Sequence, residues 1–156
     1  MSEIFINKAR ACALTGHRFL YQDFSILKTK KIFKTLIKEG FDTFLIGMAI
    51  GFDTEAFKIL EVLRKKYPIK LIACIPCENQ DLKFNEKQKK EYKKLLESAD
   101  ERVLISKEYT EKCMQQRNEF MVDNCSCLVA YLKKDYGGTA KTVKYAEKNA
   151  INIIYL

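Results

Sequence analysis

The sequence contains one histidine, no tryptophan and only two prolines among its 156 residues. No apolar run approaches the roughly 18 residues that a membrane-spanning helix needs. The opening stretch MSEIFINKARACALTG lacks the basic and apolar regions of an export signal. We therefore expect a cytoplasmic protein that has no membrane partner.

The scarcity of histidine also limits the catalytic chemistry, because a Ser or Cys triad would need His17 and no GxSxG motif is present. The six cysteines lack regular spacing, which indicates a reduced compartment. CIPC, from Cys74 to Cys77, has the spacing of a redox pair, but Cys74 belongs to an apolar, strand-like run. Cys125 and Cys127 form a CxC pair, which departs from the usual zinc spacing, so we expect no metal site.

Positive charge exceeds negative charge, and the formal net charge is +8. Such a balance suits a polyanion, so nucleic acid is an alternative partner. The lysines, however, are spread over segments such as KTKKIFK and EKQKKEYKK, where a solvated helix surface explains them equally well.

Short apolar runs alternate along the chain with segments of helical periodicity. This alternation predicts an α/β fold in which a parallel sheet carries helices on both faces, and no linker divides residues 1–156, so we expect a single domain. The predicted strands are 10–14, 41–46, 69–75, 102–105, 128–132 and 151–156. Two predicted helices end at Gly40 and at Pro68, and three more span 85–99, 110–124 and 139–149.

Ligands of such sheets bind beyond the carboxyl ends of the strands, so the loops from strand to helix matter most. The first of them, TGHR, contains Thr15, Gly16, His17 and Arg18. A glycine allows the backbone to approach a phosphate, and an arginine can bind the phosphate with two hydrogen bonds. A tight turn with a surface arginine is the alternative interpretation.

The second loop, GMAIGFD, places Gly47 and Gly51 four residues apart and ends in Asp53. It lacks the middle glycine of the dinucleotide motif GxGxxG and follows the second strand, so that motif is not assigned. Asp53 or Thr54 could also serve only as the N-cap of the next helix.

The loop before the last helix, DYGGTAKT, resembles part of a P-loop because Lys141 and Thr142 match its final pair. Ala140 and Asp135 stand where that motif requires glycine, so the loop is not a P-loop. It still places two glycines and Thr139 at a helix N-terminus, which favours an anion.

A helix in the segment CMQQRNEFMVDNC would place Met114, Asn118, Met121 and Cys125 on one face. Asn118 is polar within this apolar stripe and adjoins Arg117 in sequence. A buried polar group needs a partner, so either Asn118 caps a loop in the core or the pair contacts a ligand.

Taken in order, the motifs TGHR, GxxxGxD, IPCxxQ, RNxxMVDxC and GGTxxTxxYA resemble the YpsA-like family of the SLOG superfamily, which is named for DprA and the LOG nucleotide hydrolases. The resemblance covers nearly the whole chain. It implies a Rossmann-like, three-layer αβα sandwich with a mainly parallel sheet, in which the strand ends bind nucleotides or nucleotide-derived ligands.

The resemblance also implies a set of ligand-binding residues and one departure from the LOG pattern. The glutamate that LOG enzymes use for catalysis is replaced by Thr142, so LOG hydrolysis should be absent or very weak, and the expectation leans away from an enzyme. The expected binding residues are Thr15, Gly16, His17, Arg18, Gly47, Met48, Gly51, Asp53, Pro76, Gln80, Arg117, Asn118, Gly137, Gly138, Thr139 and Thr142.

These residues lead to three functional hypotheses. In the first, the protein senses, carries or sequesters a nucleotide-derived ligand such as ADP-ribose or an NAD-type molecule and requires no cofactor. In the second, it is a nucleotide N-glycosidase or phosphohydrolase that uses Asp53, Glu55 or Glu119 as the carboxylate. In the third, it binds single-stranded DNA as DprA does, on a basic face such as KEYKK. Apolar helix faces are also compatible with a homodimer.

Overall fold

The computed structural model describes residues 4–156, so the first three residues of the N-terminal stretch considered above lie outside the description. Within this range the chain forms six strands and five α-helices, preceded by a short 3-10 turn, Lys8–Arg10. The strands are β1 (Ala11–Gly16), β2 (Thr43–Ile46), β3 (Lys70–Ile75), β4 (Glu101–Leu104), β5 (Cys127–Tyr131) and β6 (Asn152–Tyr155). The helices are α1 (Ile26–Lys38), α2 (Phe52–Arg64), α3 (Glu86–Ser98), α4 (Cys113–Asp123) and α5 (Gly138–Lys148).

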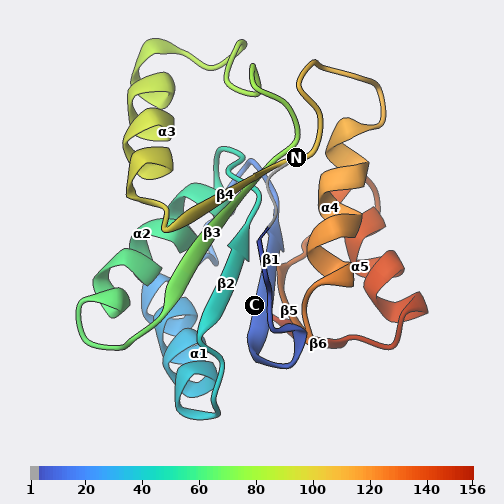
Figure 1. Cartoon of the computed structure of the whole chain (residues 1–156). Helices are drawn as coiled ribbons and strands as arrows, with labels where there is room; N and C mark the ends of the chain where they lie inside the picture. Colours follow the sequence, from blue (N-terminus) through green and yellow to red (C-terminus); the bar gives the residue numbers. More distant parts are fainter. Residues whose placement is uncertain (1–3) are drawn as a thin grey trace.

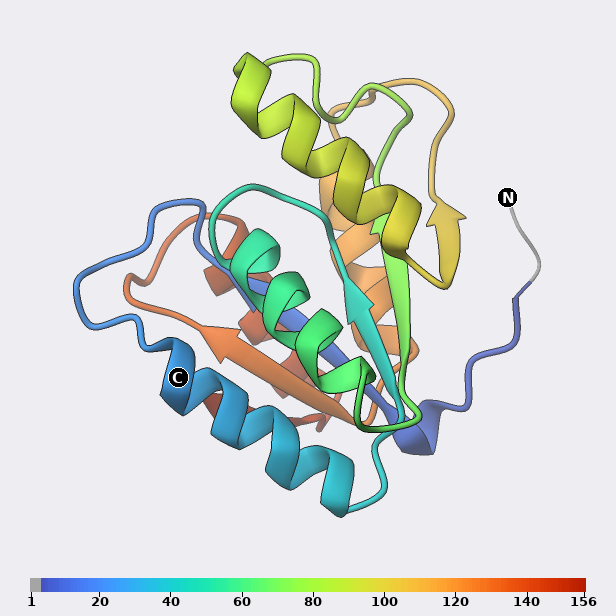
Figure 2. The same ribbon diagram turned by 90° about the vertical axis from the view of Figure 1, so that its left-hand side faces the viewer.

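The strands form one sheet in the order β4-β3-β2-β1-β5-β6. All five strand pairs are parallel. Helices α1, α2 and α3 cover one face and α4 and α5 cover the other (Figures 1 and 2). The predicted Rossmann-like, three-layer αβα fold is confirmed, and the sheet is parallel throughout rather than mainly parallel.

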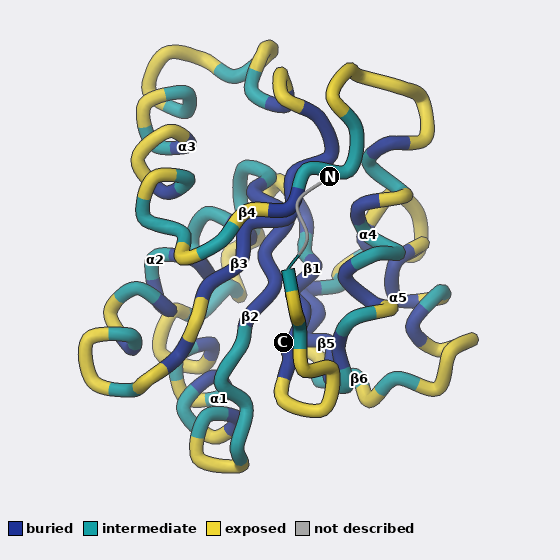
Figure 3. The backbone as a smooth tube through the Cα atoms, viewed as in Figure 1, coloured by how far each residue is buried: buried dark blue, intermediate teal, exposed yellow. Residues whose placement is uncertain are grey.

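The sheet forms because its central strands are apolar on both faces, as parallel strands under two helix layers must be. Every residue of β5 and the first five residues of β1 are buried (Figure 3). Phe33 of α1 packs edge to face on Phe44 of β2, with 5.8 Å between the ring centroids. On the other face Met121 of α4 and Val143 of α5 belong to the second buried cluster.

The predicted boundaries differ from the observed ones by a few residues, and local hydrogen bonds explain the clearest differences. Helix α4 begins at Cys113 rather than at residue 110, because the Cys113 N–H bonds to the Thr110 carbonyl in a turn. Strand β2 begins at Thr43 rather than at residue 41, and the Phe41 N–H bonds instead to the Leu36 carbonyl at 3.0 Å in the turn that ends α1.

The order of the sheet reverses at β1, which lies between β2 and β5. At such a reversal the loops that leave two neighbouring strands diverge to opposite faces and open a crevice. The loops after β1, β2 and β5 therefore meet at one edge of the sheet. Within residues 4–156 no helix combines the length and the apolar character that a membrane span requires.

Candidate functional site

A cavity of about 360 Å³ lies at the carboxyl ends of β1, β2 and β5, and we call it the first cavity. It brings together most of the residues predicted from the sequence, although they come from four separate segments. Those that line it are Thr15, Gly16, His17, Arg18, Gly47, Asp53, Arg117, Asn118, Gly137, Gly138 and Thr139.

His17 ties two of these loops together and is held as a neutral ring. Its Nε2 accepts a hydrogen bond from the Lys133 backbone N–H at 2.8 Å, and its carbonyl accepts one from the Phe52 N–H at 3.1 Å. Burial, aided by Lys134 and Lys133, lowers the pKa of His17. The only histidine therefore fixes the position of the loops and does not present a cation to a phosphate.

Gly51 shapes the wall of the cavity without lining it. Its φ is +81°, and a methyl group at this position would overlap the backbone carbonyl of Arg18. Gly16 likewise has no room for a side chain, because a Cβ would overlap the ring of Phe52. The glycines of the first two motifs thus allow the β1 and β2 loops to pack against each other.

Arg117 is 5% exposed, and its guanidinium bonds mainly to the protein. It donates to the backbone carbonyls of Gly47 and Cys74 and, through Nε, to Asn118 Oδ1 at 2.7 Å. Burial lowers the pKa of Arg117, and the carboxylate of Asp53 opposes this shift. The Asn118 side chain therefore pairs with Arg117 and does not cap a loop of the core through this oxygen. Both residues line the cavity, and Arg117 also braces its wall.

Asp53, in the first turn of α2, is 7% exposed. Its Oδ2 accepts a hydrogen bond from the Ala49 N–H at 3.1 Å, whereas Oδ1 is buried and has no hydrogen-bond partner among the described residues. Burial raises the pKa of Asp53 to about 6, although Arg117, Ala49 and Arg18 act in the opposite direction. A buried acceptor without a partner is costly, so this oxygen is suited to a donor from a bound molecule.

The start of α5 forms the opposite wall and has the properties of an anion site. The N-cap is Gly137, with a φ of +93°, and no side chain caps the helix. No atom lies within 4 Å of the position that a Cβ on Gly138 would occupy. The first turn contains no acidic residue, and Lys134 and Thr139 line the cavity nearby. The free N–H groups of this turn and the helix dipole favour a phosphate.

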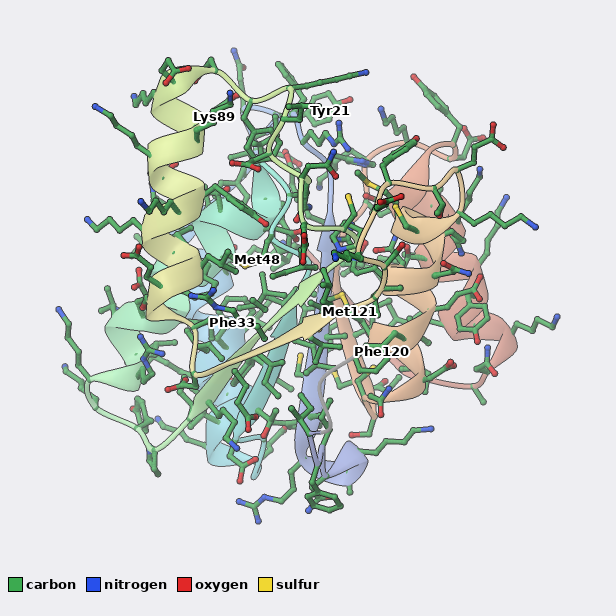
Figure 4. The ribbon with its side chains drawn as sticks, turned by 45° about the horizontal axis from the view of Figure 1, so that its top comes forward. Tyr21, Phe33, Met48, Lys89, Phe120 and Met121 are labelled. Carbon is green, nitrogen blue, oxygen red and sulfur yellow. The ribbon has the colours of Figure 1, made fainter. Side chains whose placement is uncertain are left out.

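Several residues of the cavity were missed by the sequence analysis. They are Leu14, Phe19, Tyr21, Ala49, Met114, Met121 and Lys134. Phe19 and Tyr21 directly follow TGHR, and an aromatic pair beside that motif was the available signal. Their rings meet edge to face with 5.1 Å between centroids. Figure 4 shows Tyr21 near the top of the view and Met121 below it, on the side of α4.

Four other predicted residues lie away from the first cavity. Met48 is buried on the side of α3 (Figure 4). Gln80 donates to the Gly47 carbonyl at 3.2 Å and so supports the wall from behind. Pro76 is buried, and its carbonyl accepts the Ser106 N–H at 3.1 Å. Thr142 donates its hydroxyl to the Gly138 carbonyl at 2.8 Å inside α5.

The candidate carboxylates are also separated by the fold. Glu55 lies 3.5 Å from Lys58 Nζ, and Glu119 accepts a hydrogen bond from Gln115 at 2.9 Å. Neither of these glutamates lines the first cavity, whereas Asp53 does. Asp53 is therefore the member of this trio that a ligand in the cavity would meet.

The structure also places the cysteines and the KEYKK segment. Burial raises the pKa of Cys74 to about 12, which opposes the reactive thiolate that a redox pair requires. In the described part of the chain no three His, Cys, Asp or Glu side chains form a group suited to a metal ion. Tyr92, the aromatic residue of KEYKK, is 8% exposed and donates to Gln80 Oε1 at 3.3 Å, so it offers no ring for base stacking.

Comparison with known families gives a match to the YpsA model, described as the YspA SLOG family, over residues 22–156. The uncharacterized SPbeta prophage-derived protein YoqJ of Bacillus subtilis is 32% identical over 126 residues, which are 72% of this chain and 74% of YoqJ. A UPF0398 protein of Listeria innocua is 30% identical over 104 residues, which are 64% of this chain. The chain spans only 58% of that relative.

Solved structures of DNA processing protein A (DprA) share the fold. The protein from Streptococcus pneumoniae superposes with a TM-score of 0.68 at 18% identity, covering 94% of this chain and 50% of that one. The protein from Helicobacter pylori, whose structure describes single-stranded DNA binding, gives a TM-score of 0.69 at 17% identity. That match covers 96% of this chain and 66% of the Helicobacter protein.

Proposed function

The chain belongs to the YpsA family of the SLOG superfamily, and on that premise we propose that the first cavity binds a phosphorylated, nucleotide-derived ligand of the ADP-ribose or NAD type. In this proposal the protein senses, carries or sequesters the ligand and needs no further cofactor. The phosphate lies at the start of α5, and the ribose lies toward Asp53.

The observation that carries the proposal is the unpartnered, buried Oδ1 of Asp53, located across the cavity from an uncapped helix N-terminus. A phosphate alone would be repelled by Asp53, and a sugar alone would leave the N–H groups of α5 without an anion. A molecule with a phosphate at one end and hydroxyl donors beside it satisfies both walls. Nucleotides have this arrangement.

The test is calorimetric titration of ADP-ribose, NAD and AMP into the wild-type protein and three variants. Gly138→Ala places a methyl group at the phosphate position, and Lys134→Ala removes the lysine that lines the cavity near the start of α5. We expect each to weaken binding about tenfold or more, in line with the strength of a charge-assisted hydrogen bond. Lys141→Ala removes an exposed lysine of the same helix that does not line the cavity and should leave binding unchanged.

Two results would contradict the proposal. One is that neither ADP-ribose, NAD nor AMP binds to the wild-type protein. The other is equal weakening by Lys134→Ala and Lys141→Ala, which would show that binding follows overall charge and not the cavity.

Hydrolysis is the second candidate function, and Asp53 is the observation that favours it. A carboxyl group whose pKa is raised to about 6 can exchange a proton near neutral pH and could act as a general base on a bound nucleotide. Incubation with the same panel, followed by chromatography of the products, tests it. Product that forms with wild-type protein and disappears with Asp53→Asn would favour the enzyme over the simple binder.

Single-stranded DNA binding is described for the Helicobacter DprA, which shares this fold. The residues of the present chain support it less well than nucleotide binding. The predicted stacking residue of the basic helix, Tyr92, is buried. A labelled oligonucleotide whose mobility changes at low salt, and changes less with Lys134→Ala, would restore this candidate.

A further inference from the structure

A second and larger cavity, of about 600 Å³, adjoins the first one. We call it the second cavity. It lies among the β2–α2 loop, the β3–α3 loop and the β4–α4 loop, and the last two rise side by side at the top of Figure 1. Of the binding residues predicted from the sequence, only Arg18 and Gln80 line it.

The two cavities are adjacent. Arg18, Ala49 and Met114 line both of them. Arg18 Nη2 lies 3.8 Å from Met114 Sδ, so these two side chains form the threshold between the cavities. A molecule that occupies both cavities would pass these two side chains, of which Arg18 is exposed.

The walls of the second cavity differ chemically from those of the first. They contain the rings of Phe84 and Tyr109, the apolar side chain of Leu82, and the amides of Asn79 and Gln88. The charged residues of this wall are Arg18 and Lys83, and it contains no carboxylate among the described residues. Such a wall suits an uncharged heteroaromatic ring, which can stack on the side chains and bond to the amides at its edge.

The ring of Phe84 is held in position before any ligand binds. The Phe84 ring packs edge to face on Tyr92 with 5.7 Å between centroids, and Tyr92 is buried. Tyr109 and Leu82 are 61% and 66% exposed, so their apolar surfaces are available to a ligand. A ring that enters here gains contacts without requiring the core to move.

We propose that the second cavity holds the nucleobase of the ligand, while the first cavity holds its phosphate and ribose. This inference rests on the proposed function and assigns a new subsite to it. The positive charge of Arg18 and Lys83 opposes a pyridinium cation, so the base that enters is a neutral one such as adenine.

The rim of the first cavity offers the main competing position, because Phe19 is 68% exposed there. The Phe19 and Tyr21 rings already contact each other, and the Tyr21 N–H is bonded to Tyr131 at 2.9 Å. The second cavity provides surfaces on several loops and polar groups for the edge of the base, whereas the rim provides only one ring and its neighbour. Experiment can separate the two positions.

The experiment compares ADP-ribose with ribose 5-phosphate, which lacks a base, on wild-type protein, Tyr109→Ala, Leu82→Ala and Phe19→Ala. All three side chains are exposed, so thermal melting should change little. We expect Tyr109→Ala to weaken ADP-ribose binding about tenfold and Leu82→Ala to weaken it several-fold, because a stacked base typically contributes that much. Ribose 5-phosphate should bind wild type and Tyr109→Ala equally. Phe19 lines the first cavity, where both probes bind, so Phe19→Ala should change the affinity for the two probes by the same factor.

Each failure has its own signature. If Phe19→Ala weakened ADP-ribose binding but not ribose 5-phosphate binding, and Tyr109→Ala weakened neither, the base would lie at the rim of the first cavity. That result would overturn the inference, while the proposed function would stand. Unchanged ADP-ribose binding in both Tyr109→Ala and Leu82→Ala would also overturn the inference alone. If wild-type protein binds neither probe and no member of the nucleotide panel, the proposed function and the inference both fail.

Discussion

Helices α2 and α5 begin on opposite sides of the first cavity, and both begin at a glycine with a positive φ and no side-chain cap. By contrast, α1 and α3 begin away from the cavity and are capped by Ser25 and Asn85. An uncapped start leaves backbone N–H groups available to other partners. At the start of α2 the protein itself supplies one, because the His17 carbonyl accepts the Phe52 N–H.

The charges of the two starts are opposite. The first turn of α2 contains Asp53 and Glu55, whereas that of α5 contains no acid and lies near Lys134. The α2 side is therefore a structural joint with one carboxylate oxygen that has no partner among the described residues, and the α5 side is the anion site that we propose. Similar glycine-containing helix starts thus join two loops in one place and leave the helix without a side-chain cap in the other.

The largest expected effect is that of Gly51→Ala. The positive φ disfavours alanine, and its methyl group would overlap the Arg18 carbonyl, which is backbone and cannot rotate away. We expect a loss of at least about 4 kcal/mol or failure to fold, measured by urea unfolding. Gly138→Ala is the matched control, because the added methyl meets open space, and it should unfold at nearly the wild-type urea concentration. Similar stability of the two variants would remove the distinction between the joint and the anion site.

The next effect compares two arginines. Arg117→Met removes three hydrogen bonds and leaves Asp53 without its main opposing charge, so we expect a loss of about 3–5 kcal/mol in urea unfolding. Arg18→Met removes an exposed side chain and should change stability by less than about 0.5 kcal/mol. The order should reverse for ADP-ribose, since Arg18→Met should weaken binding about tenfold in calorimetry. An Arg117 variant of wild-type stability would show that this guanidinium does not hold the wall.

The fold could be predicted from the sequence because its determinants are local. Apolar runs such as that of β5, helix ends such as Gly40 and the alternation of the two patterns are visible without tertiary information. The motif glycines and Asp53 were also placed in the correct loops. A parallel sheet brings the loops after its strands to one edge, so the prediction of such a sheet already placed most residues of the first cavity on the same side of the molecule.

The sequence could not show the directions in which the side chains of the site point, because packing decides them. Arg117 and Asn118 are neighbours on α4, and only packing decides that Arg117 turns to the Gly47 carbonyl. Thr142 matched the family pattern, but its hydroxyl bonds within its own helix. The second cavity was not predicted, because Leu82, Phe84 and Tyr109 come from two irregular loops whose approach is a tertiary property.

A smaller effect tests the charge of the α2 side. The pKa of Asp53 is about 6 in the folded protein and 3.8 is its ordinary value, so the folded state binds this proton more tightly than the unfolded state. The free energy of unfolding should therefore fall by no more than roughly 3 kcal/mol as pH rises from about 4 to about 6, and it should stay level above that range. Asp53→Asn lacks this titration, so the difference in unfolding free energy, variant minus wild type, should grow in favour of the variant over the same window. A difference that is constant from pH 4 to 7.5 would contradict a buried carboxylate at this position.

The smallest effect is expected at Thr142, the position where the LOG pattern has a glutamate. Its hydroxyl donates to the Gly138 carbonyl, and a carbonyl within a helix also accepts a backbone hydrogen bond. Thr142→Val should therefore lower the free energy of unfolding by less than about 1 kcal/mol. ADP-ribose affinity should be unchanged, because Thr142 does not line the first cavity. Thr139→Val, one turn earlier and on the cavity wall, should weaken ADP-ribose about fivefold to tenfold by loss of a hydroxyl at the phosphate. If instead Thr142→Val weakened ADP-ribose as much as Thr139→Val did, the binding surface of α5 would extend beyond its first turn, and the position of the missing glutamate would belong to the site after all.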